Sequence, residues 1–218
     1  MADNQTLQRS TSSEVGKSEA TGESAGVGKI AFSSFVGTAL EWYDFFLFGT
    51  ASALVFNHLF FATQSPTVAL LSSFATFGVG FLARPFGAIL FGKMGDRYGR
   101  RPALILSIVV IGAATGFIGL LPTYFTIGIA APILLTLARL AQGIAVGGEW
   151  GGATTLALEH APEEKRARYA ALVQAGSPVG TLLSSGAFAL VFLLPAETVD
   201  SWAWRLPFLA AFPFLLVA

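Results

Sequence analysis

Five ionisable residues lie inside long apolar stretches of the sequence: Glu41, Asp44, Arg84, Arg139 and Glu149. On insertion scales, a charged Asp, Lys or Arg at the centre of a membrane helix costs about 2.5–3.5 kcal/mol. Side chains of this kind face the interior of a helix bundle, pair with one another or line the path of a solute. The sequence therefore predicts ion pairing, proton transfer or anion binding at these five positions.

Two of the five, Glu41 and Asp44, are three residues apart and so share one face of a helix. Two neighbouring carboxylates in a medium of low dielectric do not both ionise easily, so one of them is expected to hold a proton. We treat Glu41, Asp44 and Glu149 as candidates for proton coupling. The alternative is that one or both carboxylates in the first stretch simply neutralise Arg84 or Arg139.

The segment RLAQGIAVGGEWGG (139–152) combines polar residues with closely spaced glycines. In a helix, Arg139, Gln142 and Glu149 fall within an arc of about 80°. Beside them, glycines recur at every fourth position and form a stripe along the helix, namely Gly143, Gly147 and Gly151. A stripe of small residues predicts close approach of another helix. The forked guanidinium of an arginine binds both oxygens of a carboxylate. Arg139 and Gln142 are therefore substrate-binding candidates, and a structural ion pair with one of the buried carboxylates is the alternative.

A second polar stripe follows in the next apolar stretch, within an arc of about 100°; it comprises Gln174, Ser177, Thr181, Ser184 and Ser185. Such a stripe lines a water-filled path or bonds neighbouring helices together, and both readings stay open. Gln174 and Ser177 join Arg84 as substrate-binding candidates. Pro178 is expected to bend this helix.

Long apolar helices must position these residues, because the chain is 54% hydrophobic and only 12% charged. A helix needs about 20 apolar residues to cross a bilayer. The sequence predicts an all-α membrane protein, with residues 1–28 as a disordered cytoplasmic tail and residues 29–218 as one bundle. The expected spans lie near 30–60, 67–92, 103–121, 131–158, 170–194 and 203–218. The sixth has no polar flank, so we expect it to be incomplete, in a truncated chain or a partial sequence.

Composition excludes several other functions. The formal net charge of zero argues against a nucleic-acid partner, and the absence of cysteine excludes thiolate chemistry. Neither a metal site nor another cofactor is expected, since His58 and His160 are distant from each other. An intramembrane enzyme is not expected either, because Ser177 in GSPVG has no histidine within reach as a base.

Basic residues cluster in two of the connections between spans. Those after the second span are Lys93, Arg97, Arg100 and Arg101, and those after the fourth are Lys165, Arg166 and Arg168. Loops rich in Lys and Arg stay in the cytoplasm, and two spans separate these connections. The pattern predicts a multi-pass protein of the plasma or inner membrane, with a cytoplasmic amino terminus.

The first basic connection carries the segment GKMGDRYGRR (92–101). Glycines at positions 95 and 99 are expected to permit a tight turn with positive φ. The segment strongly resembles the loop 2–3 signature of the major facilitator superfamily, G-x-x-[GA]-D-[RK]-x-G-[RK]-[RK]. By that resemblance it forms a conformational gate, made of Gly92, Gly95, Asp96, Arg97, Gly99, Arg100 and Arg101.

Further segments extend the resemblance over about residues 30–218. RLAQGIAVGGEWGG resembles the superfamily's span-four motif, and ALEHAPEEKRAR resembles the charged exit of that span. EWYDFFLFGTA, FLARPFGAILFG and SWAWRLPF are similar to the metabolite:H⁺ symporter branch, which includes carriers of shikimate, α-ketoglutarate, citrate and proline/betaine. The match covers only the amino-terminal half of such proteins, a six-helix bundle expected to form a 3+3 inverted repeat.

The resemblance implies a secondary transporter that works by alternating access. Its expected partners are H⁺, a small organic acid or zwitterion, the lipid bilayer and a missing carboxyl-terminal six-helix half. In relatives, the residue matching Asp96 contacts the carboxyl half and steadies the outward-facing state. The alternative function is a non-transporting truncated membrane protein that acts as a binding or regulatory partner.

Overall fold

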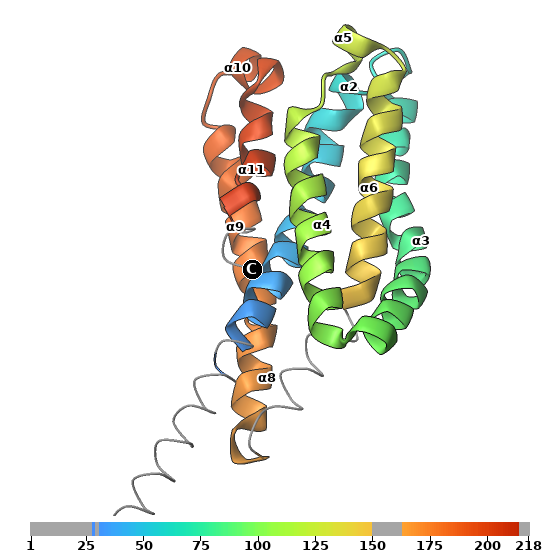
Figure 1. Ribbon diagram of the computed structural model, residues 1–218. Coiled ribbons are helices and arrows are strands. Elements are labelled where there is room, and N and C mark those ends of the chain that lie inside the picture. Colours follow the sequence, from blue (N-terminus) through green and yellow to red (C-terminus); the bar gives the residue numbers. More distant parts are fainter. Residues whose placement is uncertain (1–27, 29–30, 150–162, 214–218) are drawn as a thin grey trace, which may run out of the picture.

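The computed structural model describes residue 28 and the ranges 31–149 and 163–213, except for the side chains of Glu149 and Lys165. Every regular element in these ranges is a helix (Figure 1). Only residue 28 of the predicted tail is described, and only residues 163–168 of the expected exit of the fourth span (157–168) are described.

The first helix covers residues 31–51 and continues through a π-helical turn, η1 (Ser52–Phe56), into α2 (Asn57–Leu59). Three long helices follow, with one short helix between the second and third. They are α3 (Pro66–Tyr98), α4 (Arg100–Leu120), α5 (Tyr124–Ile127) and α6 (Ala130–Glu149). The remaining elements are η2 (Glu163–Lys165), α8 (Arg166–Gln174), α9 (Gly176–Val191), α10 (Ala196–Ser201), η3 (Ala203–Arg205) and α11 (Leu206–Leu209).

The distribution of side chains is that of a membrane protein. Among the described residues, α3, α4 and residues 130–148 of α6 are long and apolar enough to cross a bilayer. Large apolar side chains such as Leu82 and Phe86 point outward, whereas Asp44 and Gln142 are buried. Helices suit this environment because each satisfies its backbone hydrogen bonds internally, where lipid offers no partner.

Helices α3 and α6 touch backbone to backbone through glycines. A Cβ atom on Gly143 would lie 2.1 Å from the carbonyl oxygen of Gly80, and one on Gly147 would lie 2.0 Å from that of Arg84. Any larger residue at these positions would force the helices apart. The predicted close approach is confirmed for Gly143 and Gly147, while Gly151 lies outside the described residues.

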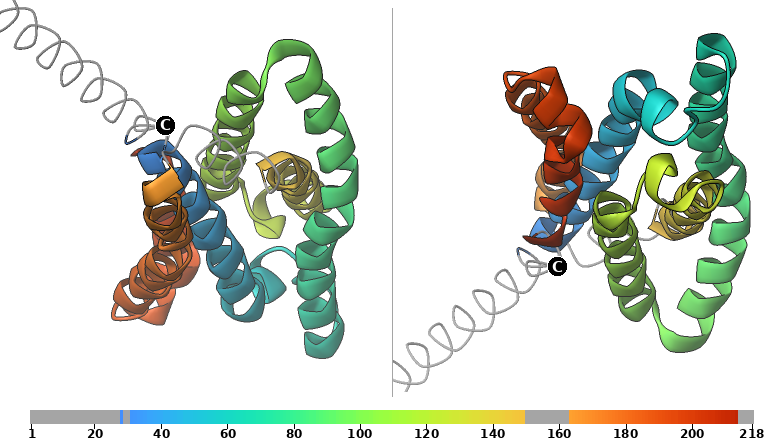
Figure 2. Two further views of the ribbon diagram at one scale, coloured as in Figure 1. Left: turned by 90° about the horizontal axis from the view of Figure 1, so that it is seen from below. Right: turned by 90° about the horizontal axis from the view of Figure 1, so that it is seen from above.

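The first helix packs on α9 in the same manner. A Cβ on Gly180 would lie 2.2 Å from the carbonyl oxygen of Ala39. The hydroxyl of Tyr43 donates a hydrogen bond to the carbonyl of Pro207, which ties the first helix to α11 as well. Seen along the bundle, α6 lies between α3 and α4, and the first helix (blue) lies beside α9 (orange) (Figure 2). The first helix therefore joins two groups of helices.

Two details differ from the sequence prediction. The turn after α3 is shorter than expected. Gly95 belongs to the helix, and Gly99 alone separates α3 from α4, with φ 94° and ψ 154°. The fifth span is interrupted at Ala175, between the end of α8 at Gln174 and the start of α9 at Gly176, rather than at Pro178. Ala175 keeps helical dihedrals (φ −63°, ψ −16°), so the helical path continues through this position. In the sixth span, the described helix α11 ends at Leu209.

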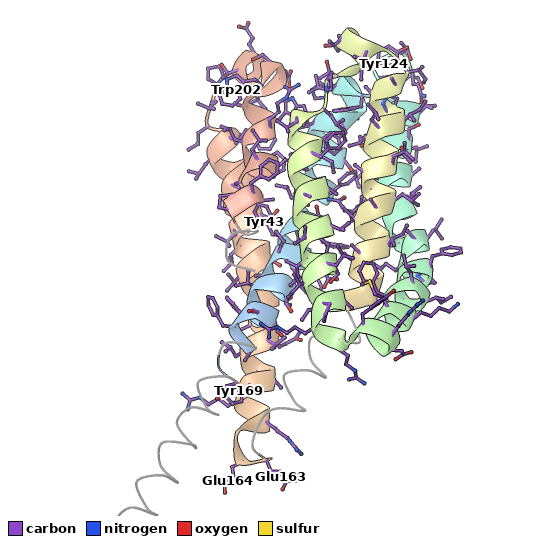
Figure 3. The ribbon with its side chains drawn as sticks, in the orientation of Figure 1. Tyr43, Tyr124, Glu163, Glu164, Tyr169 and Trp202 are labelled. Atoms are coloured by element: carbon purple, nitrogen blue, oxygen red, sulfur yellow. The ribbon has the colours of Figure 1, made fainter. Side chains whose placement is uncertain are left out.

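Both basic connections lie at the same end of the bundle, since the turn between α3 and α4 and the start of α8 are both at the bottom of Figure 1. Figure 3 shows Glu163 and Glu164 at this end, with Tyr124 and Trp202 at the opposite end. The arrangement agrees with both basic connections facing one side of the membrane.

Candidate functional site

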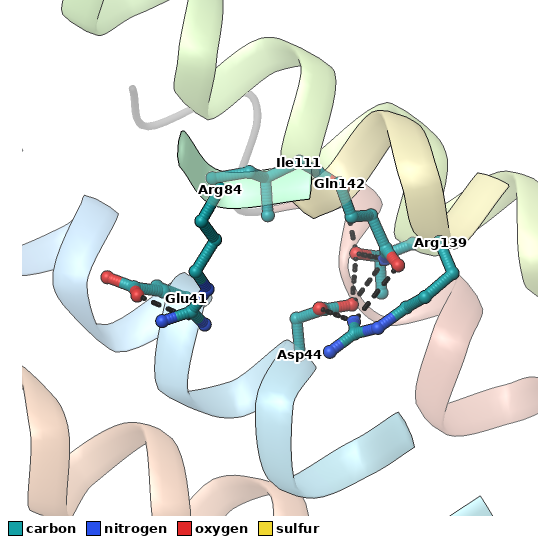
Figure 4. A network of polar contacts seen from close by, with 7 residues as sticks. Glu41, Asp44, Arg84, Ile111, Arg139 and Gln142 are labelled. Carbon is teal, nitrogen blue, oxygen red and sulfur yellow. Dashed lines mark hydrogen bonds and ion pairs between the residues drawn. The ribbon is translucent and has the colours of Figure 1, made fainter. Parts of the chain in front are cut away.

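A buried ion pair joins the first helix to α6. Nη1 of Arg139 lies 2.7 Å from Oδ2 of Asp44, and the two side chains are only 5% and 3% exposed. The separation is that of a short, charge-assisted hydrogen bond. Because neither side chain reaches solvent, each depends on the other for neutralisation (Figure 4).

Two neutral side chains complete the surroundings of Asp44. Thr115 of α4 lies 2.7 Å from the carboxylate, through its hydroxyl, and Nε2 of Gln142 donates to the same oxygen, Oδ1. Gln142 also accepts a bond of 3.1 Å from Arg139, and its Nε2 lies 2.9 Å from the hydroxyl of Thr115. Asp44 is thus bonded to both α4 and α6, so a change in its charge acts on three helices together.

Aromatic rings cover the arginine of this pair. The guanidinium carbon of Arg139 lies 4.5 Å from the ring centre of Phe48 and 4.9 Å from that of Phe77. Its stem lies against Gly80, where a Cβ would come within 2.8 Å of the Nε atom. Glycine at this position of α3 lets the arginine lie flat between the helices.

A second, looser ion pair lies beside the first. Nη2 of Arg84 on α3 is 3.8 Å from Oε1 of Glu41, with side-chain exposures of 27% and 10%. This distance exceeds that of a hydrogen bond. The guanidinium also lies over the ring of Phe81, 4.7 Å from its centre. Figure 4 shows the two pairs side by side, each reaching from the first helix.

The structure therefore places four of the five charged residues of the apolar stretches in two ion pairs. Glu41 and Asp44 do not face each other, because each lies beside a different arginine. Arg139 and Gln142 meet at Asp44, as their shared arc suggested. The side chain of Glu149 lies outside the described residues.

The other candidates lie apart from this network. Gln174 is exposed on α8, and Ser177 is partly buried on α9. In the gate segment, four candidates belong to the end of α3, namely Gly92, Gly95, Asp96 and Arg97, and two begin α4, Arg100 and Arg101. Asp96 and Arg100 line a pocket of about 260 Å³ between α3, α4 and α6.

Sequence reasoning missed Thr115 and the aromatic rings. Thr115 lies in a span without charges, where a lone hydroxyl residue gave the only signal. The rings come from the run EWYDFFLF and from Phe77 and Phe81. Their spacing looks like ordinary core packing, so only the fold shows that they surround the arginines.

Long apolar helices that pack closely and hold two ion pairs between them are typical of the membrane domains of transport proteins. The sequence profile of the "Sugar (and other) transporter" family matches residues 30–218. The chain belongs to this family, which is part of the major facilitator superfamily. The predicted resemblance and the fold class are confirmed.

Similar proteins include two from Escherichia coli K12. The chain is 50% identical over 182 residues to the inner membrane metabolite transport protein YhjE, covering 83% of this chain and 41% of that protein. It is 50% identical over 191 residues to the shikimate transporter, covering 87% and 44%. The proline/betaine transporter of Salmonella typhimurium is 40% identical over 190 residues, with coverage of 87% and 38%.

Solved structures agree in fold. The inward open xylose transporter XylE from E. coli matches with a TM-score of 0.73 and 22% identity, over 88% of this chain and 46% of that one. A crystal structure of a D-xylose-proton symporter matches with a TM-score of 0.74 and 20% identity, over 88% and 47%. The chain thus spans less than half the length of the relatives that it matches.

Proposed function

We propose that this chain is the amino-terminal half of a proton-coupled symporter that carries a small organic acid or similar metabolite by alternating access. It is proposed to lie in the plasma or inner membrane with a cytoplasmic amino terminus. The observation that carries the proposal is the buried pair of Asp44 and Arg139, which holds the first helix against α6. The names of the relatives support the substrate class, since they include shikimate and proline/betaine transporters.

The pair links protonation to helix contacts. Ionised Asp44 attracts Arg139 and accepts hydrogen bonds from α4 and α6. A proton on the carboxylate removes the charge that holds Arg139, and this weakens the contact between the first helix and α6. Proton binding then favours a different arrangement of the helices, which is what coupled transport requires.

Substrate is proposed to bind between this bundle and a second six-helix bundle, and the segment from Gly92 to Arg101 is proposed to act as the gate between them. In the superfamily signature, Asp96 holds the position that contacts the second bundle. The pocket lined by Asp96 and Arg100 supports this role, because it opens between three helices at the end that carries the basic connections.

The experiment uses the complete reading frame that contains this chain, purified and reconstituted in proteoliposomes. An inwardly directed proton gradient should drive accumulation of labelled shikimate or proline above its external concentration. Dissipating the gradient with a protonophore should reduce uptake to equilibration. Absence of gradient-driven uptake for shikimate, proline, betaine and α-ketoglutarate would contradict the proposal and favour a non-transporting binding partner.

A further inference from the structure

The two arginines of the site differ in burial and in how tightly a carboxylate holds them. Arg139 is 5% exposed, is bonded to Asp44 and Gln142, and lies against the rings of Phe48 and Phe77. A ligand that approached this guanidinium would first have to break the short contact with Asp44. Arg139 is therefore a poor anchor for a substrate while Asp44 is ionised.

Arg84 has the opposite character. Its side chain is 27% exposed, and its contact with Glu41 is 3.8 Å long. Within the described part of the chain, the guanidinium lies beside the carboxylate of Glu41 and over the ring of Phe81. Because no short hydrogen bond with a described residue uses the N–H groups at its fork, an incoming carboxylate can take two of them in parallel.

An aromatic surface adjoins this guanidinium. The ring of Phe45 lies 5.6 Å from that of Phe81 and 5.2 Å from that of Phe77, and Trp42 lies 5.7 Å from Phe45. Trp42 and Phe45 are half-buried, and Phe81 is exposed to 40%. Edge-to-face and tilted rings at these distances attract one another, so the side chains form one continuous apolar wall.

We propose that Arg84 and the rings of Phe45, Phe81 and Trp42 form the part of the substrate site that binds a small carboxylate with a ring or hydrocarbon body. The guanidinium binds the carboxylate, which replaces Glu41 as its nearest anion. The aromatic wall covers the apolar face of the same molecule. This inference rests on the proposed function, because it names the substrate class of the same site and assigns anion binding to Arg84 rather than to Arg139.

The arrangement separates two tasks between two ion pairs. The tight pair of Asp44 and Arg139 is buried and is suited to responding to protons. The loose pair of Glu41 and Arg84 is more exposed and is suited to exchanging one carboxylate for another. Phe77 lies between the two, since its ring contacts both Phe45 and the guanidinium of Arg139. A ligand on the aromatic wall is therefore one ring away from the tight pair.

The test measures binding directly, without transport. The complete reading frame that contains this chain is placed in lipid nanodiscs. Binding is followed by tryptophan fluorescence, and the part of the signal that a Trp42→Phe control removes reports on this site. The probes are cyclohexanecarboxylate, its neutral amide, acetate and tetramethylammonium. We expect saturable binding of cyclohexanecarboxylate, with the amide and acetate each weaker by about tenfold or more, the scale of one charge-assisted bond or of the buried ring.

Two variants locate the site. Arg84→Gln should weaken binding of cyclohexanecarboxylate by about tenfold, and Phe81→Leu by a smaller factor. The matched control is Arg205→Gln, because Arg205 also lies over an aromatic ring, that of Trp204, but belongs to η3 and to neither the proposed site nor the gate. If Arg84→Gln does not fold, Phe81→Leu alone decides the question.

Several results would overturn the inference. They are the absence of saturable carboxylate binding in the wild-type carrier, unchanged affinity in folded Arg84→Gln and Phe81→Leu, or preferential binding of tetramethylammonium. These outcomes are distinct from failure of the proposed function. Gradient-driven uptake by the complete carrier, with unaltered affinity in Arg84→Gln, would leave symport standing and remove only this site.

Discussion

Replacing Asp44 with asparagine tests whether the buried pair holds the bundle together. The change keeps the shape of the side chain but leaves the charge of Arg139 buried without its counterion. Removing one partner of a buried ion pair costs about 3–5 kcal/mol. Hydrogen bonding adds to this, because Oδ2 meets Arg139 and Oδ1 meets Gln142 and Thr115. Whichever way the new amide turns, its NH₂ group faces a donor from Arg139 or Gln142.

The remaining neighbours of Arg139 offset part of the cost. It keeps the carbonyl oxygen of Gln142 at 3.1 Å and the faces of two rings. A desolvated cation on an aromatic face gains about 2 kcal/mol, but this contact is present in both proteins and does not replace the lost charge. We expect a loss of about 3 kcal/mol in the free energy of unfolding, at the lower end of the range for a broken buried pair.

The assay is unfolding of the purified chain in mixed micelles titrated with dodecyl sulfate. Wild type is compared with Asp44→Asn, Arg139→Gln and the double variant, which form a double-mutant cycle. The double variant should lose less free energy of unfolding than the two single variants lose together. The difference, the coupling energy of the pair, should be about 2 kcal/mol or more. Asp200→Asn is the matched control, since its contact with His58 is half exposed and worth about 0–1 kcal/mol. Losses that simply add would refute the account of the pair.

Three further predictions concern the frame around the site. Gly143→Val should abolish the monodisperse folded protein in size-exclusion chromatography, because a Cβ would lie 2.1 Å from a carbonyl oxygen of α3. The control Gly186→Val should behave as wild type, since a Cβ there meets nothing within 4 Å. Equal behaviour of the two variants would contradict the packing of α3 on α6. Gly99→Ala should lower the free energy of unfolding by about 1–3 kcal/mol, because a backbone with φ 94° and ψ 154° suits glycine alone. The control Gly95→Ala should not destabilise the chain, since Gly95 is helical. A cysteine at Glu197 should react with an impermeant reagent added to intact cells, and one in the turn after α3 should not; the reverse pattern would contradict the orientation.

The sequence predicted the framework well where one physical constraint decided the outcome. Continuous apolar runs of about 20 residues favoured helices, since a helix of that length crosses a bilayer and satisfies its own backbone hydrogen bonds. Glycines at spacing four required a close neighbour, and α3 occupies that place at Gly143 and Gly147. Charges inside apolar runs required burial together, and Asp44, Arg139 and Gln142 indeed meet.

The pairing itself could not be predicted, because it depends on the rotation of each helix. Glu41 and Asp44 share one face broadly, yet a small angular difference directs one to Arg84 on α3 and the other to Arg139 on α6. Thr115 gave little signal, since a single hydroxyl in a membrane helix often bonds only to its own backbone. The interruption at Ala175 also escaped prediction, because proline indicates a distortion of a helix but does not fix its position.

The most direct test of the central claim compares two carboxylate variants in the complete carrier, Asp44→Asn and Glu41→Gln. Each is reconstituted in proteoliposomes, and both gradient-driven accumulation and exchange of labelled substrate across equal pH are measured. If Asp44 carries the coupled proton through its pair with Arg139, Asp44→Asn should abolish accumulation and retain exchange, while Glu41→Gln should still accumulate substrate. Full accumulation by Asp44→Asn, or its selective loss in Glu41→Gln, would contradict the assignment of proton coupling to Asp44.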